Sequence, residues 1–335
     1  MRKLATVQKI KDLQPIEGAD KIEKATVLGW QLVVKKGEFT VGDYCVYFEI
    51  DSILPEKAEF EFLRPRKFRI KTAKLRGQIS QGIAFPISIL EGYENVKIQI
   101  GYDVTEIIGV KKYEPPLSVM MSGKVKGGFP GFIHKTDETR IQSVPDVLTR
   151  PENQGLRCYI TEKVDGTSVT YYLSDGEFGA CSRNLELLEG ENNIHWMVAK
   201  QYDIENNLRK LNRNIAVQGE ILGPKIQSNK YDFAKHTVLL FSIFDFDKYM
   251  YLNYEDFISL AKKAGFETVP VLRDDYILGK DTVDDLVALS EAKSVLNPEI
   301  QQEGIVIRPV IEAQDSELGR LSFKVVNPRF LLKYE

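Results

Sequence analysis

The sequence contains few of the residues from which disulfides and metal sites are built. Its 335 residues include three cysteines and three histidines. Cys45, Cys158 and Cys181 lie far apart, no CxxC pair occurs, and no HExxH motif is present. These absences argue against a disulfide framework, a cysteine zinc site and a histidine-based metal site.

Long hydrophobic runs are also missing. None approaches the ~20 apolar residues that a membrane-spanning helix needs. The opening segment, MRKLATVQKIKDLQP, is basic but is not followed by the apolar stretch of a secretory signal. We therefore expect no membrane partner and a cytoplasmic location, or a nuclear or organellar one in a eukaryotic cell.

Two common phosphate-binding loops, GxxxxGK[ST] and GxGxxG, do not occur either, so a P-loop or a Rossmann turn is not expected. The composition is otherwise that of a globular protein, with 43% hydrophobic and 28% charged residues. A chain of this length is expected to form about two domains.

The charge of the chain is unevenly distributed. The net charge is −3, yet residues 1–115 carry 19 Lys and Arg against 16 Asp and Glu. Seven cations without an intervening acid form a basic run, namely Arg64, Arg66, Lys67, Arg69, Lys71, Lys74 and Arg76. Composition alone favours a solvated sheet edge. The alternative is a surface that binds nucleic-acid phosphates, because a polyanion would relieve the repulsion among these cations.

The first 115 residues resemble a small all-β domain. Residues 25–28, 31–35 and 44–50 are rich in β-branched and aromatic residues and are separated by glycines. Only residues 5–12 and 19–24 have a weak helical period. We therefore predict an OB-like, nucleic-acid-binding β-barrel over residues 1–115. The Pro- and Gly-rich stretch that follows predicts a linker over 116–130.

Strands and helices alternate irregularly after residue 131. Strands are expected at 157–163, 168–173, 216–222, 237–246 and 304–310, and helices at 191–211, 254–264 and 282–296. The first two strands are expected to pair around a turn at 164–167. The lack of a regular βαβ rhythm favours antiparallel sheets and the α+β class for residues 131–335.

The turn region contains the motif K-x-D-G, at Lys163, Asp165 and Gly166. Taken alone, this motif is most simply an ordinary hairpin turn. The functional interpretation is a nucleophilic lysine at a strand end, with a carboxylate two residues later on the same side.

Further motifs follow Lys163 in a fixed order: SRN at 182–184, GEILGP at 219–224, FSIFDFD at 241–247, EGIVIR at 303–308 and LSFKVVNP at 321–328. Together they resemble the motifs of the covalent nucleotidyltransferase superfamily, which contains polynucleotide ligases and mRNA capping enzymes. The resemblance implies an adenylyltransferase domain of ATP-grasp-like antiparallel sheets with helices.

The resemblance also assigns roles to residues. Lys163 is implied to be the nucleophile that takes AMP from ATP, with Lys324 on the α-phosphate and Glu303 as a further catalytic group. The implied ATP-binding residues are Glu162, Lys163, Asp165, Gly166, Arg183, Glu220, Phe244 and Lys324. Asp165, Glu220 and Glu303 are implied to hold Mg²⁺ or Mn²⁺, partly through water. Phe241 is interpreted as a core residue.

One motif departs from the superfamily pattern. The last motif of related ligases usually has two lysines, K-x-K, whereas this chain has Lys324 followed by Val326 at the second position. Arg308 and Arg329 are the candidates for the missing phosphate contact.

The order of the domains indicates which group within the superfamily this chain resembles. Only 11 residues follow Lys324, which is too few for a domain, and the OB-like domain comes first. This arrangement resembles the RNA ligases of the Naegleria and Deinococcus type. KTDETRIQ at 135–142 and GPKIQSN at 223–229 also resemble segments of that family, although the first is equally interpretable as a capped helix start.

The resemblance implies an ATP-dependent RNA ligase that acts as a monomer. Lys163 would form a lysyl-AMP, AMP would pass to a 5′-phosphate, and a 3′-hydroxyl would attack that end, most simply at a nick in an RNA-containing duplex. Two alternatives stay open. One is a GTP-dependent capping enzyme or a DNA ligase, and the other is a nucleic-acid-binding protein with a degenerate catalytic domain.

Overall fold

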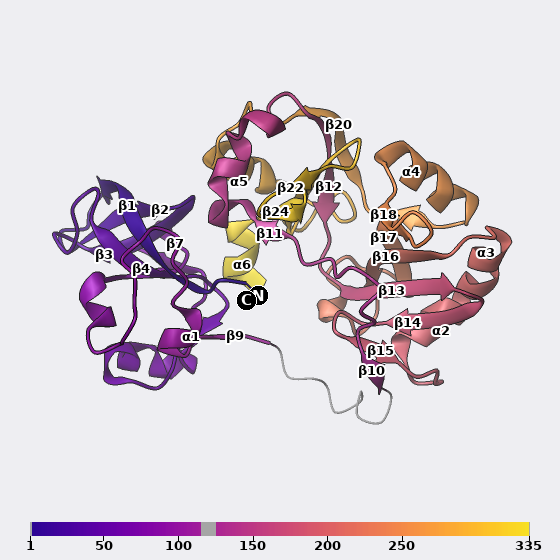
Figure 1. Ribbon diagram of the computed structural model, residues 1–335, viewed down its shortest axis with the longest axis horizontal. Coiled ribbons are helices and arrows are strands. Elements are labelled where there is room, and N and C mark those ends of the chain that lie inside the picture. Colours follow the sequence, from indigo (N-terminus) through magenta and orange to yellow (C-terminus); the bar gives the residue numbers. More distant parts are fainter. Residues whose placement is uncertain (1, 115–124, 335) are drawn as a thin grey trace. The chain divides into compact units, whose positions relative to one another are not determined.

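The computed structural model describes residues 2–114 and 125–334 (Figure 1). The chain divides into two compact units. The described residues of unit 1 come from Met1–Pro116, Ile141–Val147 and Pro328–Glu335, and those of unit 2 from Leu117–Arg140 and Leu148–Asn327. No helix in the described part of the chain is long and apolar enough to cross a membrane.

Unit 1 is built mainly from short strands. Its strands are β1 (Ala5–Pro15), β2 (Ile22–Val27), β3 (Trp30–Lys35), β4 (Tyr44–Phe48), β5 (Ser52–Ile53), β6 (Ala73–Leu75), β7 (Gln78–Ser80), β8 (Ile83–Pro86) and β9 (Lys111–Lys112). Its helices are α1 (Thr105–Ile108) and α6 (Pro328–Tyr334), with 3₁₀ turns at Ala58–Arg66, Ile87–Leu90 and Ile141–Ser143; a further 3₁₀ turn, Pro145–Leu148, ends in unit 2.

A five-stranded sheet organises this unit, in the order β3-β2-β1-β4-β8. All its pairs are antiparallel, and Trp30, Phe48 and Phe60 are buried against it. The rings of Phe48, Phe60 and Phe85 meet edge to face, with centroids 5.5–5.8 Å apart. The expected all-β character is confirmed.

The weak helical periods at 5–12 and 19–24 were misleading. Residues 5–12 belong to β1, and residues 19–24 form a turn that leads into β2. Five of the first six positions of β1 are buried, and β1 pairs with β4 through residues 5–9 and with β2 through residues 10–15. Strand pairing therefore overrides a weak local helical tendency.

Two later segments also pack in unit 1. Gln142 accepts a hydrogen bond from the Gly29 amide at 2.9 Å, and Ser143 donates its hydroxyl to Glu49 at 2.5 Å. The sequence analysis ended the first domain at residue 115 and began the catalytic domain at residue 131, so it did not assign these later segments to the first domain. Of the expected linker, residues 116–124 lie outside the described residues, while 125–128 form a strand.

Unit 2 contains both strands and helices. The strands are β10 (Val125–Gly128), β11 (Thr139–Arg140), β12 (Arg157–Lys163), β13 (Thr167–Ser174), β14 (Glu177–Cys181), β15 (Leu185–Leu187), β16 (Ile215–Leu222), β17 (Thr237–Asp245), β18 (Met250–Tyr251), β19 (Glu267–Thr268), β20 (Val271–Ile277), β21 (Gly304–Pro309), β22 (Gln314–Asp315), β23 (Gly319–Arg320) and β24 (Phe323–Val326). The helices are α2 (Ile194–Gln201), α3 (Ile204–Lys210), α4 (Tyr254–Lys263) and α5 (Val283–Ser290), with 3₁₀ turns at Pro151–Asn153 and Gln227–Asn229.

Two large sheets form the framework of unit 2. The eight-stranded sheet has the order β10-β15-β14-β13-β16-β17-β18, with β19 beside β17, and the five-stranded sheet has the order β11-β24-β21-β12-β20. Only the short pairs β11–β24 and β17–β19 are parallel. Helices α2, α3 and α4 contribute buried apolar residues to the core on one face of the eight-stranded sheet (Figure 1). The α+β class with antiparallel sheets is confirmed.

The expected pairing of 157–163 with 168–173 is wrong, although both strands exist. β12 pairs with β20 and β21, whereas β13 pairs with β14 and β16. Residues 164–166 therefore connect one sheet to the other instead of closing a hairpin. Lys163 is the last residue of β12, so it lies where the chain passes between the two sheets.

Helix α5 is shorter than the expected 282–296. It ends at Ser290, and Ser294 and Val295 beyond it hydrogen-bond to the side chain of Glu162. Its beginning follows the sequence signal: the Thr282 hydroxyl accepts from the Asp285 amide, and the Asp285 carboxylate accepts from the Thr282 amide. This capping box satisfies two amides that the helix leaves unpaired.

Replacing the N-cap residue should weaken this helix. We expect Thr282→Ala to lower the free energy of unfolding by about 0.5–2 kcal/mol, because the Asp285 amide loses its acceptor. Thr282→Ser keeps the hydroxyl and should stay near the wild-type value. Urea unfolding followed by circular dichroism measures both; equal losses in the two variants would contradict the role of the cap.

Candidate active site

The predicted nucleophile lies beside a predicted metal ligand that is 140 residues away in the sequence. Lys163 pairs in the five-stranded sheet with Gly304, which follows Glu303. The Lys163 amine donates a hydrogen bond to Glu303 Oε1 at 2.5 Å, and both side chains are largely buried. The strand register therefore brings the K-x-D-G motif and the EGIVIR motif together.

Acidic groups surround this amine. Burial alone would lower the pKa of Lys163, but the charges of Glu303, Glu220 and Asp165 outweigh it and raise that pKa. Burial also raises the pKa of Glu303, and it raises that of Glu220 to about 8 against the opposing charge of Lys163. The site thus gathers more carboxylates than its own cations stabilise, and added positive charge would keep them ionised.

These carboxylates fit a divalent cation bound partly through water. Glu303 Oε2 is buried and has no hydrogen-bond partner, so it offers an unused hard oxygen ligand. In the part of the chain that the structure describes, no three His, Cys, Asp or Glu side chains are grouped so that they could hold one ion. Asp165, Glu220 and Glu303 would therefore need water molecules to complete the shell.

The segment after Lys163 is held against the other sheet. The Asp165 amide donates to the Tyr231 hydroxyl at 2.8 Å, and the Asp165 carboxylate forms an ion pair with Lys230. A Cβ at Gly166 would lie 2.4 Å from the Ile221 carbonyl and 2.8 Å from Cγ of Glu220. Gly166 therefore permits the close approach that brings Glu220 near Lys163. Sequence reasoning missed Lys230, which directly follows the segment at 223–229.

Glu162 occupies a different position from the other predicted ATP-binding residues. Its side chain is 1% exposed and accepts hydrogen bonds from the Ser294 hydroxyl at 2.5 Å and the Val295 amide at 2.8 Å. Adjacent residues of a strand point to opposite faces, so this carboxylate is directed away from the face of Lys163. In this structure Glu162 joins β12 to the segment after α5.

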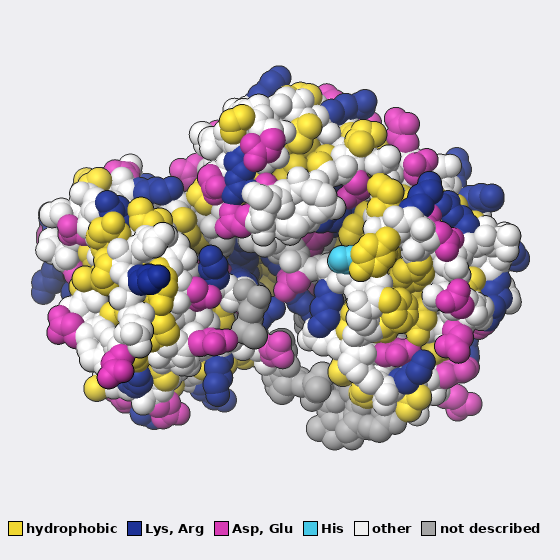
Figure 2. Space-filling view, viewed as in Figure 1, with side chains coloured by type: hydrophobic (Ala, Val, Ile, Leu, Met, Phe, Trp, Pro, Cys, Tyr) yellow, Lys and Arg dark blue, Asp and Glu magenta, His cyan; other side chains and the backbone are white. Residues whose placement is uncertain are grey.

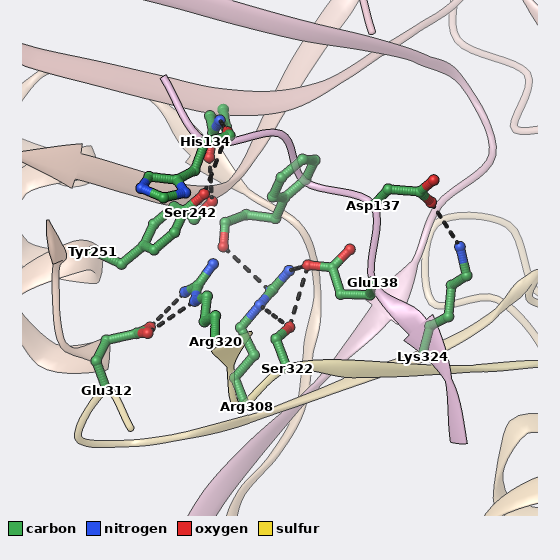
Figure 3. A network of polar contacts seen from close by, with 12 residues as sticks. His134, Asp137, Glu138, Ser242, Tyr251, Arg308, Glu312, Arg320, Ser322 and Lys324 are labelled. Atoms are coloured by element: carbon green, nitrogen blue, oxygen red, sulfur yellow. Dashed lines mark hydrogen bonds and ion pairs between the residues drawn. The ribbon is translucent and has the colours of Figure 1, made fainter. Parts of the chain in front are cut away.

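A single aspartate connects two predicted phosphate-binding cations. Asp137 accepts from Arg183 at 2.7 Å and from Lys324 at 3.3 Å, and its pairing with Lys324 is drawn in Figure 3. Burial lowers the pKa of Lys324 to about 8, and the charges of Lys163 and Arg140 act in the same direction. Asp137 belongs to the segment at 135–142, whose alternative interpretation as a helix start is wrong, because residues 135–140 contain no helix.

The structure places the candidates for the missing second phosphate contact in different surroundings. Val326 is buried. Arg308 is 2% exposed, and its guanidinium binds Glu138 at 2.5 Å, the Ser322 hydroxyl at 3.0 Å and a backbone carbonyl (Figure 3). Arg329 lies on α6, in unit 1. Arg140 stands directly opposite Lys324 in the β11–β24 pair, and the sequence analysis did not consider it.

Phe241 and Phe244, both in the FSIFDFD motif, differ in accessibility. Phe244, predicted to stack on adenine, is 1% exposed and is packed by the rings of Phe246, Tyr249 and Tyr251. Phe241 was interpreted as core, yet it is only partly buried and packs beside Val164, next to the nucleophile. A register shift between β16 and β17 at this point interrupts the strict alternation of side chains.

The basic run separates into three groups in unit 1. Arg64 pairs with Glu61 at 2.5 Å and with Glu56 at 3.2 Å. Lys74 and Arg76 belong to the β6–β7 hairpin. The remaining four cations are Arg66, Lys67, Arg69 and Lys71. Together with Tyr113 and other residues they line a cavity of about 590 Å³.

Arg69 is fixed within this cavity. It binds Asp51 at 2.9 Å and lies 3.6 Å from the centre of the Tyr113 ring. Lys67 and the following Phe68 both have positive φ, at 52° and 58°, which bends the chain sharply at the cavity. The run therefore forms a concave cationic surface.

Comparison with known proteins agrees with both units. An OB-fold domain family matches residues 4–87, and the RNA ligase family matches residues 156–326. No curated protein sequence gave a match.

Solved structures of Naegleria gruberi RNA ligase are similar to the whole chain. The structure with PPi is 38% identical, with 100% of this chain and 99% of that chain covered and a TM-score of 0.89. An apo mutant is 37% identical, covering 99% and 98%, with a TM-score of 0.89. A mutant with ATP and Mn is 38% identical, covering 99% of each chain, with a TM-score of 0.88. The chain, which combines an N-terminal OB-fold domain with this catalytic domain, therefore belongs to the RNA ligase family.

Proposed function

We propose that this chain is an ATP-dependent RNA ligase that joins 3′-hydroxyl and 5′-phosphate ends at nicks, through a lysyl-AMP intermediate. The observation that carries the proposal is the Lys163 amine, 2.5 Å from Glu303 and within the field of Glu220 and Asp165. Complexes of the similar Naegleria gruberi enzyme with ATP and Mn and with AMP and Mn support ATP and a divalent metal for this chain.

The first step requires a neutral amine. Lys163 Nζ donates to Glu303 Oε1, so Glu303 holds the amine in place and accepts its hydrogen bond before attack on the α-phosphorus of ATP. Asp165, Glu220 and Glu303 would hold a divalent cation, whose positive charge would lower the pKa of the amine so that it releases its proton to solvent. Pyrophosphate leaves and AMP remains attached to Nζ.

Cations in the site stabilise the negative charge on the phosphate. Lys324 and Arg183, which both bind Asp137 in this structure, exchange that carboxylate for phosphate oxygens. Arg140 adds positive charge beside Lys324 and takes the place of the second lysine of the motif. AMP then passes to the 5′-phosphate of RNA, and the 3′-hydroxyl displaces it.

Unit 1 contributes RNA binding in this proposal. Its cationic cavity offers Arg66, Lys67, Arg69 and Lys71 to the phosphates of a strand. The alternatives, GTP-dependent capping or DNA ligation, are distinguished by labelling the protein with radioactive ATP or GTP and by sealing nicks with RNA or DNA on each side. A degenerate protein would not label at all.

Removing the nucleophile should abolish labelling. We expect Lys163→Ala to form no covalent AMP adduct, because no other amine takes its place at Glu303. Lys262→Ala, an exposed lysine of α4, serves as the matched control and should label normally. Denaturing electrophoresis after incubation with labelled ATP measures both, and wild-type labelling of Lys163→Ala would contradict the assignment.

Labelling should also depend on a divalent cation. We expect excess EDTA to abolish it, and Glu303→Gln or Glu220→Gln to lower the labelling rate about tenfold or more, because each removes a negative oxygen ligand. Added Mn²⁺ should restore activity to the EDTA-treated wild type. Undiminished labelling in EDTA would remove the metal from the mechanism.

The cationic cavity of unit 1 should affect RNA binding more than the chemistry on ATP. We expect Arg66→Ala with Lys67→Ala to weaken binding of a nicked RNA duplex and to reduce the slope of log affinity against log salt by about one unit per lost contact. Lys35→Ala with Lys36→Ala removes the same charge from β3 and the turn after it and is the control. Equal effects of the two double variants would show that only overall charge matters.

A further inference from the structure

A second cavity lies in unit 2, apart from the carboxylates around Lys163. Its volume is about 420 Å³, which is large enough for a nucleotide. Its walls come from residues 134–139, the end of β17, β18 and parts of 312–322, and they include none of Lys163, Glu220 or Glu303. Asp137 lines it and also binds Lys324 and Arg183, so the cavity begins next to the predicted phosphate-binding cations.

Aromatic rings form one side of this cavity. The His134 ring lies 5.1 Å from Phe244 and 5.4 Å from Tyr249, and Phe244 and Tyr249 are 5.4 Å apart. Phe244 is buried beneath them, whereas Tyr249 is 62% exposed. In Figure 3 the His134 ring lies near Tyr251, on the side of the network away from Lys324. The cavity therefore presents an exposed ring that is supported from below by buried ones.

The aromatic surface continues beyond the cavity. Phe132 is largely exposed, and its ring lies 5.5 Å from both Tyr172 and Phe246. Phe246 in turn contacts Phe244. Figure 2 shows hydrophobic side chains gathered beside a histidine over this sheet. Exposed rings in a row are the platforms on which unpaired bases of RNA stack.

The cavity is lined by two cations, Lys135 and Arg320, and by three acidic residues, each of which is paired with a cation. Arg320 lies 3.6 Å from the centre of the Tyr251 ring and is held there by Glu312 (Figure 3). Lys135 also lines the cavity. The acidic residues Glu138 and Glu312 are already paired with arginines. A base in the cavity would thus have cations within reach of its phosphate.

We propose that this cavity takes the terminal nucleotide of one RNA end, turned out of the duplex, with its base on Tyr249 and His134 and its phosphate toward Lys135 and Arg320. The inference rests on the proposed RNA-joining function and adds a subsite to it. RNA is favoured over a protein partner because the rings are interleaved with cations and the cavity adjoins the cations of the reacting phosphate. Stacking of a ring on the terminal base would hold this RNA end beside the lysyl-AMP.

The test measures binding without chemistry. The full chain is titrated with a nicked RNA duplex that lacks the 3′-hydroxyl and carries 2-aminopurine at the terminal nucleotide on one side of the nick or the other. We expect Tyr249→Ala to weaken binding about tenfold, and Tyr249→Phe, which keeps the ring, to bind like the wild type. Leu188→Ala, an exposed apolar residue outside the cavity, is the matched control.

The fluorescent base reports the position of the RNA end. With the wild type and Tyr249→Phe, one of the two 2-aminopurine positions should change its fluorescence on binding, and the change should be absent with Tyr249→Ala. Wild-type affinity and fluorescence in Tyr249→Ala would overturn the inference. So would a higher KM for ATP labelling in Tyr249→Ala with unchanged RNA affinity, because the cavity would then take the donor nucleotide.

Failure of the proposed function is distinguishable from failure of the subsite. A wild-type protein that neither labels with ATP nor seals nicked RNA contradicts the function itself. A wild-type protein that labels and seals, while all three variants bind RNA as it does, contradicts only the subsite.

Discussion

The ion pair between Lys163 and Glu303 is the interaction on which the site depends. It joins adjacent strands of the five-stranded sheet and holds the amine among groups that make it a poor nucleophile until their charge is balanced. Burial works against both partners when they are unpaired, because an isolated charge in a dry site is costly. The pairing therefore offsets the cost of burying each of the two charges.

Two consecutive acidic residues before β11 form ion pairs with different cations. Asp137 binds the exposed Arg183 and the largely buried Lys324, whereas Glu138 binds the buried Arg308. The charge of Arg308 holds the pKa of Glu138 at about 2 although burial opposes it, so this pair stays ionised. Through these pairs the aromatic cavity and the predicted phosphate-binding cations lie side by side.

The sequence predicted the strands better than their partners. The motif residues Lys163, Glu220 and Glu303 could be identified because their order matched a family, and the strands that carry them were recognised from their apolar runs. Strand partners could not be predicted, because 157–163 and 168–173 look like a hairpin locally yet join different sheets. Arg140 and Lys230 were missed since only strand register and loop packing bring them to the site.

The chain passes from one sheet to the other immediately after Lys163. This short connection limits how the two sheets can move. Only residues 164–166 separate β12 from β13, and Gly166 is packed so closely on β16 that even a methyl group would collide there. The two sheets are thus tethered at the nucleophile itself. A motion that spread the two sheets apart would pivot near this connection, so the amine of Lys163 would move less than side chains at the far ends of the strands.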